Sequence, residues 1–326
     1  FAGRRGRRKG FAMHRIGMRP RPIWRTPVVL FAGLLILLNA LACQPATPPP
    51  TMEPTPIPHP SGPNDLVLRI ETTGGLIPPS VLPTELPELS VYGDGTVIQL
   101  GPQITLYPPP ALPNLLVSRI TEDGLQRLLR EAAAAGLLAG DADYPLQGVY
   151  DAPTTFFTVN AGGRVSRVSV YALGIEHPDD PRLSPEHRLA RRRLAEFAQK
   201  ATDLLSWLPP ETIRERENPF VITRLQVVVL PAESPEAPQP EPDVQVAVRP
   251  WPLPTPLAEF GAAAPWVGPT ARCAVVSSRK ELPPLLDALR TASTLTRWRS
   301  DGTHYVLLVR PLLPDEEGCR PRHERT

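Results

Sequence analysis

The sequence predicts an α+β protein made of two small domains of antiparallel hairpins, each packed with one or two helices, after a signal peptide and a proline-rich tether. Three observations lead to this prediction. Short segments with alternating apolar residues flank Asp-Gly and Gly-Gly turns, which is typical of antiparallel hairpins. Longer segments repeat apolar residues at helical spacing. A basic stretch, an apolar stretch and a proline-rich stretch precede both kinds of segment.

The composition argues against polyanionic partners. The chain has 326 residues, 45 of them proline, and a formal net charge of +2. Nine of the 35 basic residues and none of the 33 acidic residues lie in residues 1–42, so the rest of the chain has 26 basic and 33 acidic residues and a net charge of about −7. A mildly acidic chain without an Arg/Lys stripe is not expected to bind nucleic acid or an anionic membrane surface.

The apolar stretch near the N-terminus predicts export rather than a membrane span. Eleven apolar residues, 28–38, follow three arginines, whereas a spanning helix needs about 20. Ala40, Leu41 and Ala42 then precede Cys43. This arrangement resembles the lipobox of bacterial lipoproteins, which implies diacylglyceryl transfer to the Cys43 sulfur, cleavage before Cys43, and lipid anchoring to the cell membrane on its extracytoplasmic face. An ordinary cleaved signal peptide and a short uncleaved anchor are the alternatives.

These features divide the N-terminal part into three segments. We expect an upstream extension in residues 1–17, a lipoprotein signal peptide in residues 18–42, and the lipidated Cys43 with a Pro/Thr-rich tether in residues 43–64. The tether has almost no large apolar residue, so it cannot bury enough surface to offset its ordering entropy. Its prolines favour an extended chain that holds the folded part away from the membrane.

Residues 65–208 form the first predicted α+β domain, which contains two hairpins. Asp94-Gly95 is a favoured two-residue turn and would place Val91 opposite Ile98. The second hairpin turns through residues 160–163, and Val165 breaks its alternation of apolar residues, which predicts a β-bulge.

Two helices are also predicted in this domain. Thr121 and Ser184 are the expected N-caps, and acidic residues follow both. On the second helix the apolar residues repeat at helical spacing, and Arg191, Arg192 and Arg193 lie off that stripe. We expect these three arginines to form a solvated face rather than a binding patch.

Two short motifs in this domain carry a second resemblance. The stretches SVYGDGTVI and DAPTTFFTV, separated by a helix, are similar to those of an uncharacterised domain that recurs in bacterial lipoproteins. The resemblance covers about 110 residues and implies an α+β fold, but it implies no activity.

After a linker in residues 209–218, residues 219–326 form the second predicted α+β domain, with a proline-rich loop at 231–242. A helix is expected around Pro283 and Pro284, because proline is tolerated in a first turn. Asp301-Gly302 closes the last hairpin and would place Trp298 opposite Tyr305. The two domains therefore share an order of elements, which either a diverged duplication or common α+β architecture would produce.

Cys273 and Cys319 are the two cysteines that remain once Cys43 carries lipid. In an oxidising exterior an even number of cysteines predicts a disulfide, here between a strand and the C-terminal tail. In the chain-entropy model such a bridge contributes roughly 4 kcal/mol to stability.

No catalytic or cofactor motif is present: the sequence contains no G-x-S-x-G, H-E-x-x-H, Walker loop, G-x-G-x-x-G or C-x-x-C. The sequence therefore predicts no cofactor. Two clusters are weak candidates for a metal site, and a solvated loop and a turn before a helix are the favoured alternatives. The first contains Asp141, Asp143 and Asp151; the second contains His177, Asp179 and His187.

A proline-rich segment interleaves Trp251, Phe260 and Trp266. These aromatic side chains are candidates to line a peptide or glycan groove, although such a loop more often buries its aromatics in its own domain. We expect a lipid-anchored envelope protein that is a non-enzymatic binding or structural module with an unidentified protein or glycan partner. A secreted hydrolase without a recognisable motif and a metal- or glycan-binding module remain the alternatives.

Overall fold

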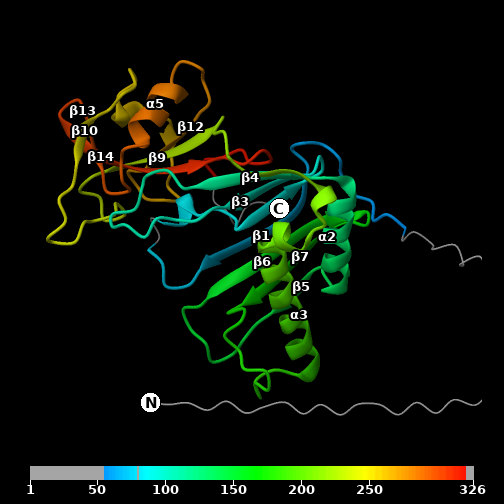
Figure 1. Cartoon of the computed structure of the whole chain (residues 1–326). Coiled ribbons are helices and arrows are strands. Elements are labelled where there is room, and N and C mark those ends of the chain that lie inside the picture. Colours follow the sequence, from blue (N-terminus) through cyan, green and yellow to red (C-terminus); the bar gives the residue numbers. More distant parts are fainter. Residues whose placement is uncertain (1–54, 79–80, 321–326) are drawn as a thin grey trace, which may run out of the picture. The chain divides into compact units, whose positions relative to one another are not determined.

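The computed structural model describes residues 55–78 and 81–320 and confirms the α+β fold class (Figure 1). The predicted extension, the signal peptide, Cys43 and the first part of the tether lie outside the described residues. None of the helices in the described part of the chain has the length and apolar character needed to cross a membrane.

The first sheet has eight strands in the order β5-β7-β6-β1-β2-β3-β4-β8. The pair β5 and β7 is parallel, and the other neighbours are antiparallel, so the sheet is mixed rather than built of hairpins alone. In chain order its strands are β1 (Leu66–Gly74), β2 (Leu89–Tyr92), β3 (Thr96–Leu100), β4 (Leu115–Ile120), β5 (Ala142–Tyr144), β6 (Pro153–Ala161), β7 (Arg164–Tyr171) and β8 (Ile213–Pro219).

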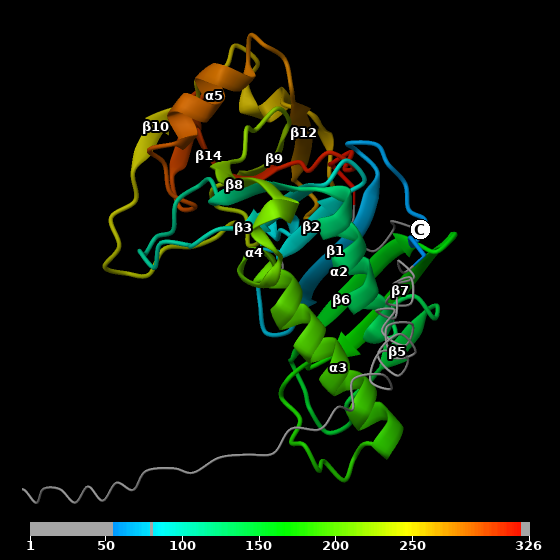
Figure 2. The same cartoon turned by 45° about the vertical axis from the view of Figure 1, so that its right-hand side comes forward.

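Two helices, α2 (Glu122–Ala134) and α3 (Pro185–Thr202), cover one face of the first sheet, and the short α4 (Leu204–Trp207) follows α3 (Figure 2). Both predicted N-caps are confirmed, because the Thr121 and Ser184 side chains accept hydrogen bonds from the backbone N–H groups of Gly124 and His187. The helices and the sheet bury a common core, in which the rings of Phe157 and Phe197 lie 6.2 Å apart.

The second sheet has six strands in the order β10-β13-β14-β9-β12-β11. Here β10 and β13 are parallel and the remaining pairs are antiparallel, and α5 (Leu282–Leu289) packs on one face. In chain order the strands are β9 (Leu225–Pro231), β10 (Val248–Pro250), β11 (Ala262–Ala263), β12 (Arg272–Val276), β13 (Arg297–Ser300) and β14 (Thr303–Pro311). The described residues also form the 3₁₀ turns η1 (Leu82–Thr84), η2 (Pro210–Thr212) and η3 (Leu257–Glu259).

The two Asp-Gly hairpins have different registers. At Asp301-Gly302 both turn residues have positive φ and Trp298 pairs with Tyr305, as predicted. At Asp94-Gly95 the prediction is wrong by one residue, because Val91 pairs with Val97 and the loop is one residue longer. Ile120 explains the difference: its N–H donates to the Gly95 carbonyl at 2.9 Å and fixes the longer loop against β4.

The predicted bulge in the hairpin of β6 and β7 is absent. The pairing runs without interruption from Thr154 with Tyr171 to Ala161 with Arg164. Val165 faces solvent, and Ser166 takes the inward position instead. A polar residue in a buried position therefore explains the irregular sequence pattern better than a bulge does.

Two segments predicted as connections are integrated into the fold. Part of the linker at residues 209–218 forms η2 and most of β8, which pairs with β4 at the edge of the first sheet. The last ten residues of the predicted tether, 55–64, are bound to the first sheet and α2. The Gln126 side chain accepts from the Ile57 N–H at 2.8 Å and donates to the Ile57 carbonyl at 2.9 Å. We call residues 55–64 the strap.

Candidate functional site

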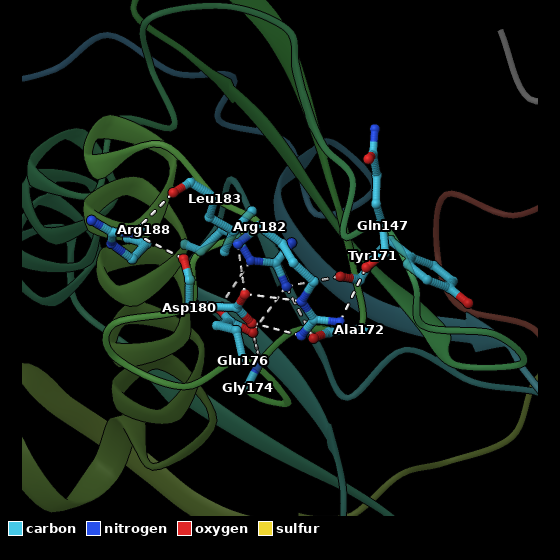
Figure 3. Close-up of polar contacts among 10 residues, drawn as sticks. Gln147, Tyr171, Ala172, Gly174, Glu176, Asp180, Arg182, Leu183 and Arg188 are labelled. Carbon is cyan, nitrogen blue, oxygen red and sulfur yellow. Dashed lines mark hydrogen bonds and ion pairs between the residues drawn. The ribbon is translucent and has the colours of Figure 1, made fainter.

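A group of hydrogen-bonded charged side chains surrounds the start of α3. The chain between β7 and α3 bends back at Gly174, which has a φ of +82°, and Ser184 with Pro185 then starts the helix. Figure 3 shows Glu176, Asp180 and Arg182 converging between the helix that carries Arg188 and the strand that carries Tyr171.

Arg191 lies at the centre of this group and has no exposed surface. Its guanidinium donates five hydrogen bonds, to both carboxylate oxygens of Glu176 at 2.9 Å and to the carbonyls of Tyr144, Tyr171 and Ala172 at 2.7–3.0 Å. The expectation of a solvated face is therefore wrong for Arg191. Through these bonds the residue ties α3 to the end of β5, to the end of β7 and to the turn after β7.

The charged neighbours are also engaged in the fold. Arg182 donates to both carboxylate oxygens of Asp180 at 2.9 and 2.6 Å, and these bonds hold the pKa of Asp180 well below its usual range. Arg188 donates to the carbonyls of Asp180 and Leu183, both at 2.9 Å. These contacts fix residues 180–183 on the first turn of α3.

An open pocket of about 330 Å³ lies beside this group. Burial alone would raise the pKa of Glu176, but the hydrogen bonds from Arg191 and from the Gly174 N–H outweigh it and lower the pKa. An ionised, hydrogen-bonded carboxylate is a weak proton acceptor, so Glu176 is poorly suited to general base catalysis. The pocket is lined by Gly174, Glu176, His177, Pro178, Pro185, Arg188, Leu189, Arg192 and Ala195.

The first predicted metal cluster is dispersed along β5 and the loop after it. Asp141 accepts a hydrogen bond from the Arg167 N–H, and Asp143 accepts one from the Ser169 hydroxyl. Asp151 lies in the following loop with a φ of +54°. These contacts hold the edge strand β5 on β7 rather than forming a ring of oxygen ligands.

The second predicted metal cluster is also dispersed. His177 lines the pocket, Asp179 is exposed in the next turn, and the His187 ring packs edge-on against Tyr144 with centroids 5.5 Å apart. Within residues 55–78 and 81–320, no three His, Cys, Asp or Glu side chains lie close enough together to hold a metal ion.

The three candidate aromatic residues near the second sheet lie in two different clusters. Trp251 and Phe260 pack edge-on, with ring centroids 5.2 Å apart, in the core beneath α5. Trp266 packs in a separate cluster that contains the Cys273 side chain. The structure therefore does not bring the three rings together in one groove.

Cys273 in β12 and Cys319 lie at disulfide distance, with Cα atoms 5.6 Å apart. The bridge connects a strand inside the second sheet to the C-terminal segment, as the sequence predicted. It also holds that segment close to a second buried group of charges.

The second buried charge group lies where the C-terminal segment meets both sheets. Arg69 on β1 donates to Asp315 at 2.8 Å, and the Tyr92 hydroxyl on β2 donates to the same oxygen at 2.8 Å. Arg310 on β14 donates twice to Glu316 at 2.6 Å and once to the Glu85 carbonyl at 2.7 Å. Sequence reasoning missed this group, although an arginine between the apolar residues of β1 was a signal.

An apolar surface is present on the loop between β3 and β4. Ile104, Leu106 and Tyr107 are each more than half exposed. The far end of this loop is fixed to the segment between α5 and β13, because the Ala111 N–H donates to the Ala292 carbonyl at 3.0 Å. An exposed apolar segment on a fixed loop is a feature of surfaces that bind other molecules.

Comparison of the chain with protein-family models, with curated proteins and with solved structures found no match.

Proposed function

We propose that this chain is a lipid-anchored protein on the extracytoplasmic face of the cell membrane, and that its folded part is a binding or structural module rather than an enzyme. The single observation that carries the anchor is Cys43, which follows Ala40-Leu41-Ala42 and an apolar stretch too short to span a bilayer. Cys273 and Cys319 at disulfide distance support the location, because disulfides persist in oxidising compartments.

The polar groups of the first sheet support a role in structure or binding. Glu176 is bound to Arg191, and Arg188 is bound to main-chain carbonyls, so the charged side chains at the pocket hold elements together. Ile104, Leu106 and Tyr107 offer an apolar contact surface for a partner.

The anchor is tested by detergent partitioning and mass spectrometry of the full chain produced in a bacterial host. We expect the wild type to enter the detergent phase with a diacylglyceryl group on Cys43, because two or three acyl chains bind membranes stably. The variant Cys43→Ser should remain in the aqueous phase. The double variant Cys273→Ser/Cys319→Ser is the matched control and should still carry lipid.

An unmodified Cys43 in the mature chain, or detergent partitioning of Cys43→Ser equal to that of the wild type, would contradict the anchor. The second result would favour the uncleaved apolar segment as the membrane contact instead.

A further inference from the structure

Arg69 and Tyr92, on neighbouring strands of the first sheet, bind a carboxylate. Arg69 has only 7% of its side chain exposed, and its Nε donates to the Ser90 hydroxyl at 3.0 Å. Its Nη2 reaches the Tyr92 hydroxyl oxygen at 3.4 Å. Ser90 and Tyr92 both lie on β2, so the first sheet itself orients the guanidinium and the phenol toward the oxygen that they bind.

The occupant of this site comes from the other end of the chain. Asp315 places one carboxylate oxygen 2.8 Å from Arg69 Nη2 and 2.8 Å from the Tyr92 hydroxyl. The chain leaves β14 at Pro311 and runs toward the strands of the first sheet, as the red segment of Figure 1 and Figure 2 shows. Leu313 packs with Tyr92, Ile98 and Leu115 beside the site.

Glu316 and Cys319 fix the same segment to the second sheet. The Glu316 carboxylate binds Arg310 through two hydrogen bonds and accepts a third from the Leu313 N–H at 3.0 Å. The Cys319 N–H donates to Gln226 at 2.7 Å, and the Gln226 amide donates to the Pro83 carbonyl at 3.0 Å. The disulfide then closes the end of the segment on β12.

The charges within this group balance, because two arginines face two carboxylates. Withdrawal of the segment would separate Arg69 and Arg310 from the carboxylates that pair with them, and breaking buried ion pairs is unfavourable. The noncovalent contacts and the disulfide both hold the segment in place. Reduction removes the covalent restraint and leaves ion pairs that a competing carboxylate can replace.

We propose that residues Leu312–Cys319 are a disulfide-secured latch: Asp315 is an intramolecular ligand of the Arg69, Ser90 and Tyr92 site, and reduction of the disulfide opens that site to a carboxylate from another acidic peptide. The ligand class is an aspartate-bearing segment, and this chain supplies its own in the oxidised state. The inference goes beyond the proposed function and does not depend on the lipid anchor.

Reduction requires an external dithiol. One thiolate of the dithiol attacks the Sγ of Cys319, which is more exposed than Cys273, and the sulfur–sulfur bond breaks to leave Cys273 as a thiolate. The second thiol of the reductant then attacks the mixed disulfide and releases Cys319. Two electrons and two protons reach the two cysteines, and the dithiol becomes a disulfide.

Amide hydrogen exchange of the oxidised and the dithiothreitol-reduced full chain tests the release. On reduction we expect exchange to accelerate by about tenfold or more in residues 312–319, β1 and β2, and to stay unchanged in α2 and α3. Unchanged exchange in residues 312–319, or equal acceleration throughout the chain, would overturn the latch.

The variant Asp315→Asn tests whether Asp315 helps to hold the segment or whether the disulfide holds it alone. The variant keeps the disulfide and the shape of the side chain but removes the charge. After reduction, residues 312–319 of this variant should exchange faster than those of the reduced wild type. The exposed Glu317 is the matched control, and Glu317→Gln should behave as the wild type does. Equal exchange in all three reduced proteins would contradict a role for Asp315.

A synthetic peptide tests whether the opened site accepts a ligand. The peptide with the sequence of residues 312–318 is added to reduced Asp315→Asn, and the same peptide with asparagine in place of its aspartate is the control. We expect only the first peptide to slow exchange in β1 and β2. No protection, or equal protection by both peptides, would overturn the assignment of a carboxylate site.

Discussion

Arg191 and Arg192 are neighbours on α3 with opposite environments. The Arg191 side chain is fully buried and hydrogen-bonded, whereas 67% of the Arg192 side chain is exposed and its Nε lies 3.9 Å from Glu196. Breaking a buried ion pair leaves an unpaired charge and unpaired carbonyls, whereas a surface pair contributes little. The two residues therefore allow the contributions of a buried and of an exposed ion pair to stability to be compared on one helix.

We expect Arg191→Ala to lower the free energy of unfolding by about 3–5 kcal/mol, because Glu176 and three carbonyls lose their donor. Arg192→Ala should change it by less than about 0.5 kcal/mol. Urea unfolding followed by circular dichroism measures both values. Similar losses in the two variants would show that the Arg191 contacts are not what stabilises the start of α3.

The ion pair of Glu176 also predicts a dependence on pH. The pKa of Glu176 in the folded chain lies below the ordinary value of 4.5, so the pair stabilises the fold above that pH and the contribution is lost as the pH falls through the folded-state pKa. The stability advantage of the wild type over Glu176→Gln should be constant between about pH 7 and pH 5 and should decrease below about pH 4.5. An advantage that does not change in urea titrations from pH 6 to pH 3.5 would contradict this assignment.

Residue environments could be predicted from the sequence only where they follow from local pattern. Phe157 and Val159 alternate along a strand, a pattern that predicts two core-facing residues, and both are buried. Arg191 lies off the apolar stripe of α3, so the pattern placed it in solvent. Its burial depends on the turn after β7, which supplies Glu176 and two carbonyls from a different part of the chain.

At the scale of elements, the two Asp-Gly turns show what a dipeptide can and cannot specify. Asp301 and Gly302 form a free two-residue turn, and their hairpin has the predicted register. Gly95 instead accepts a hydrogen bond from Ile120, 25 residues later in the chain, and the loop lengthens to reach it. The register of that hairpin is therefore set by a contact that its own sequence does not contain.

We expect Gly95→Ala to cost at least about 2 kcal/mol more than Gly163→Ala. Both glycines have positive φ, +82° and +78°, so both variants carry similar backbone strain. A Cβ on Gly95 would lie 2.2 Å from the Ile120 carbonyl oxygen, whereas a Cβ on Gly163 would meet nothing within 4 Å. Thermal unfolding of the two variants measures the loss of stability in each. Equal losses would show that the chain accommodates the added Cβ beside the Ile120 carbonyl without cost.

At the scale of the whole molecule, the sequence predicted the fold class but not how the two sheets are joined. The α+β class followed from hairpin turns and helix caps, which are local signals. The buried group of Arg69, Asp315 and Arg310 joins residues more than 200 positions apart. Charges that far apart in sequence give no sign of being partners, so the sequence alone could not reveal the candidate carboxylate site.

The strap shortens the part of the tether that could separate an anchored protein from the membrane. Among the described residues, Ile57 is bound to the fold well before Asp65, so if Cys43 carries the lipid, at most 14 peptide units separate the anchor from a bound residue instead of 22. Their fully extended length is about 50 Å instead of about 77 Å. The volume that the folded part can reach around its anchor grows with the cube of the tether length, so the strap reduces that volume about fourfold. In an anchored chain, the contact between Ile57 and Gln126 would thereby raise the local concentration of the folded part near the membrane without adding a membrane contact.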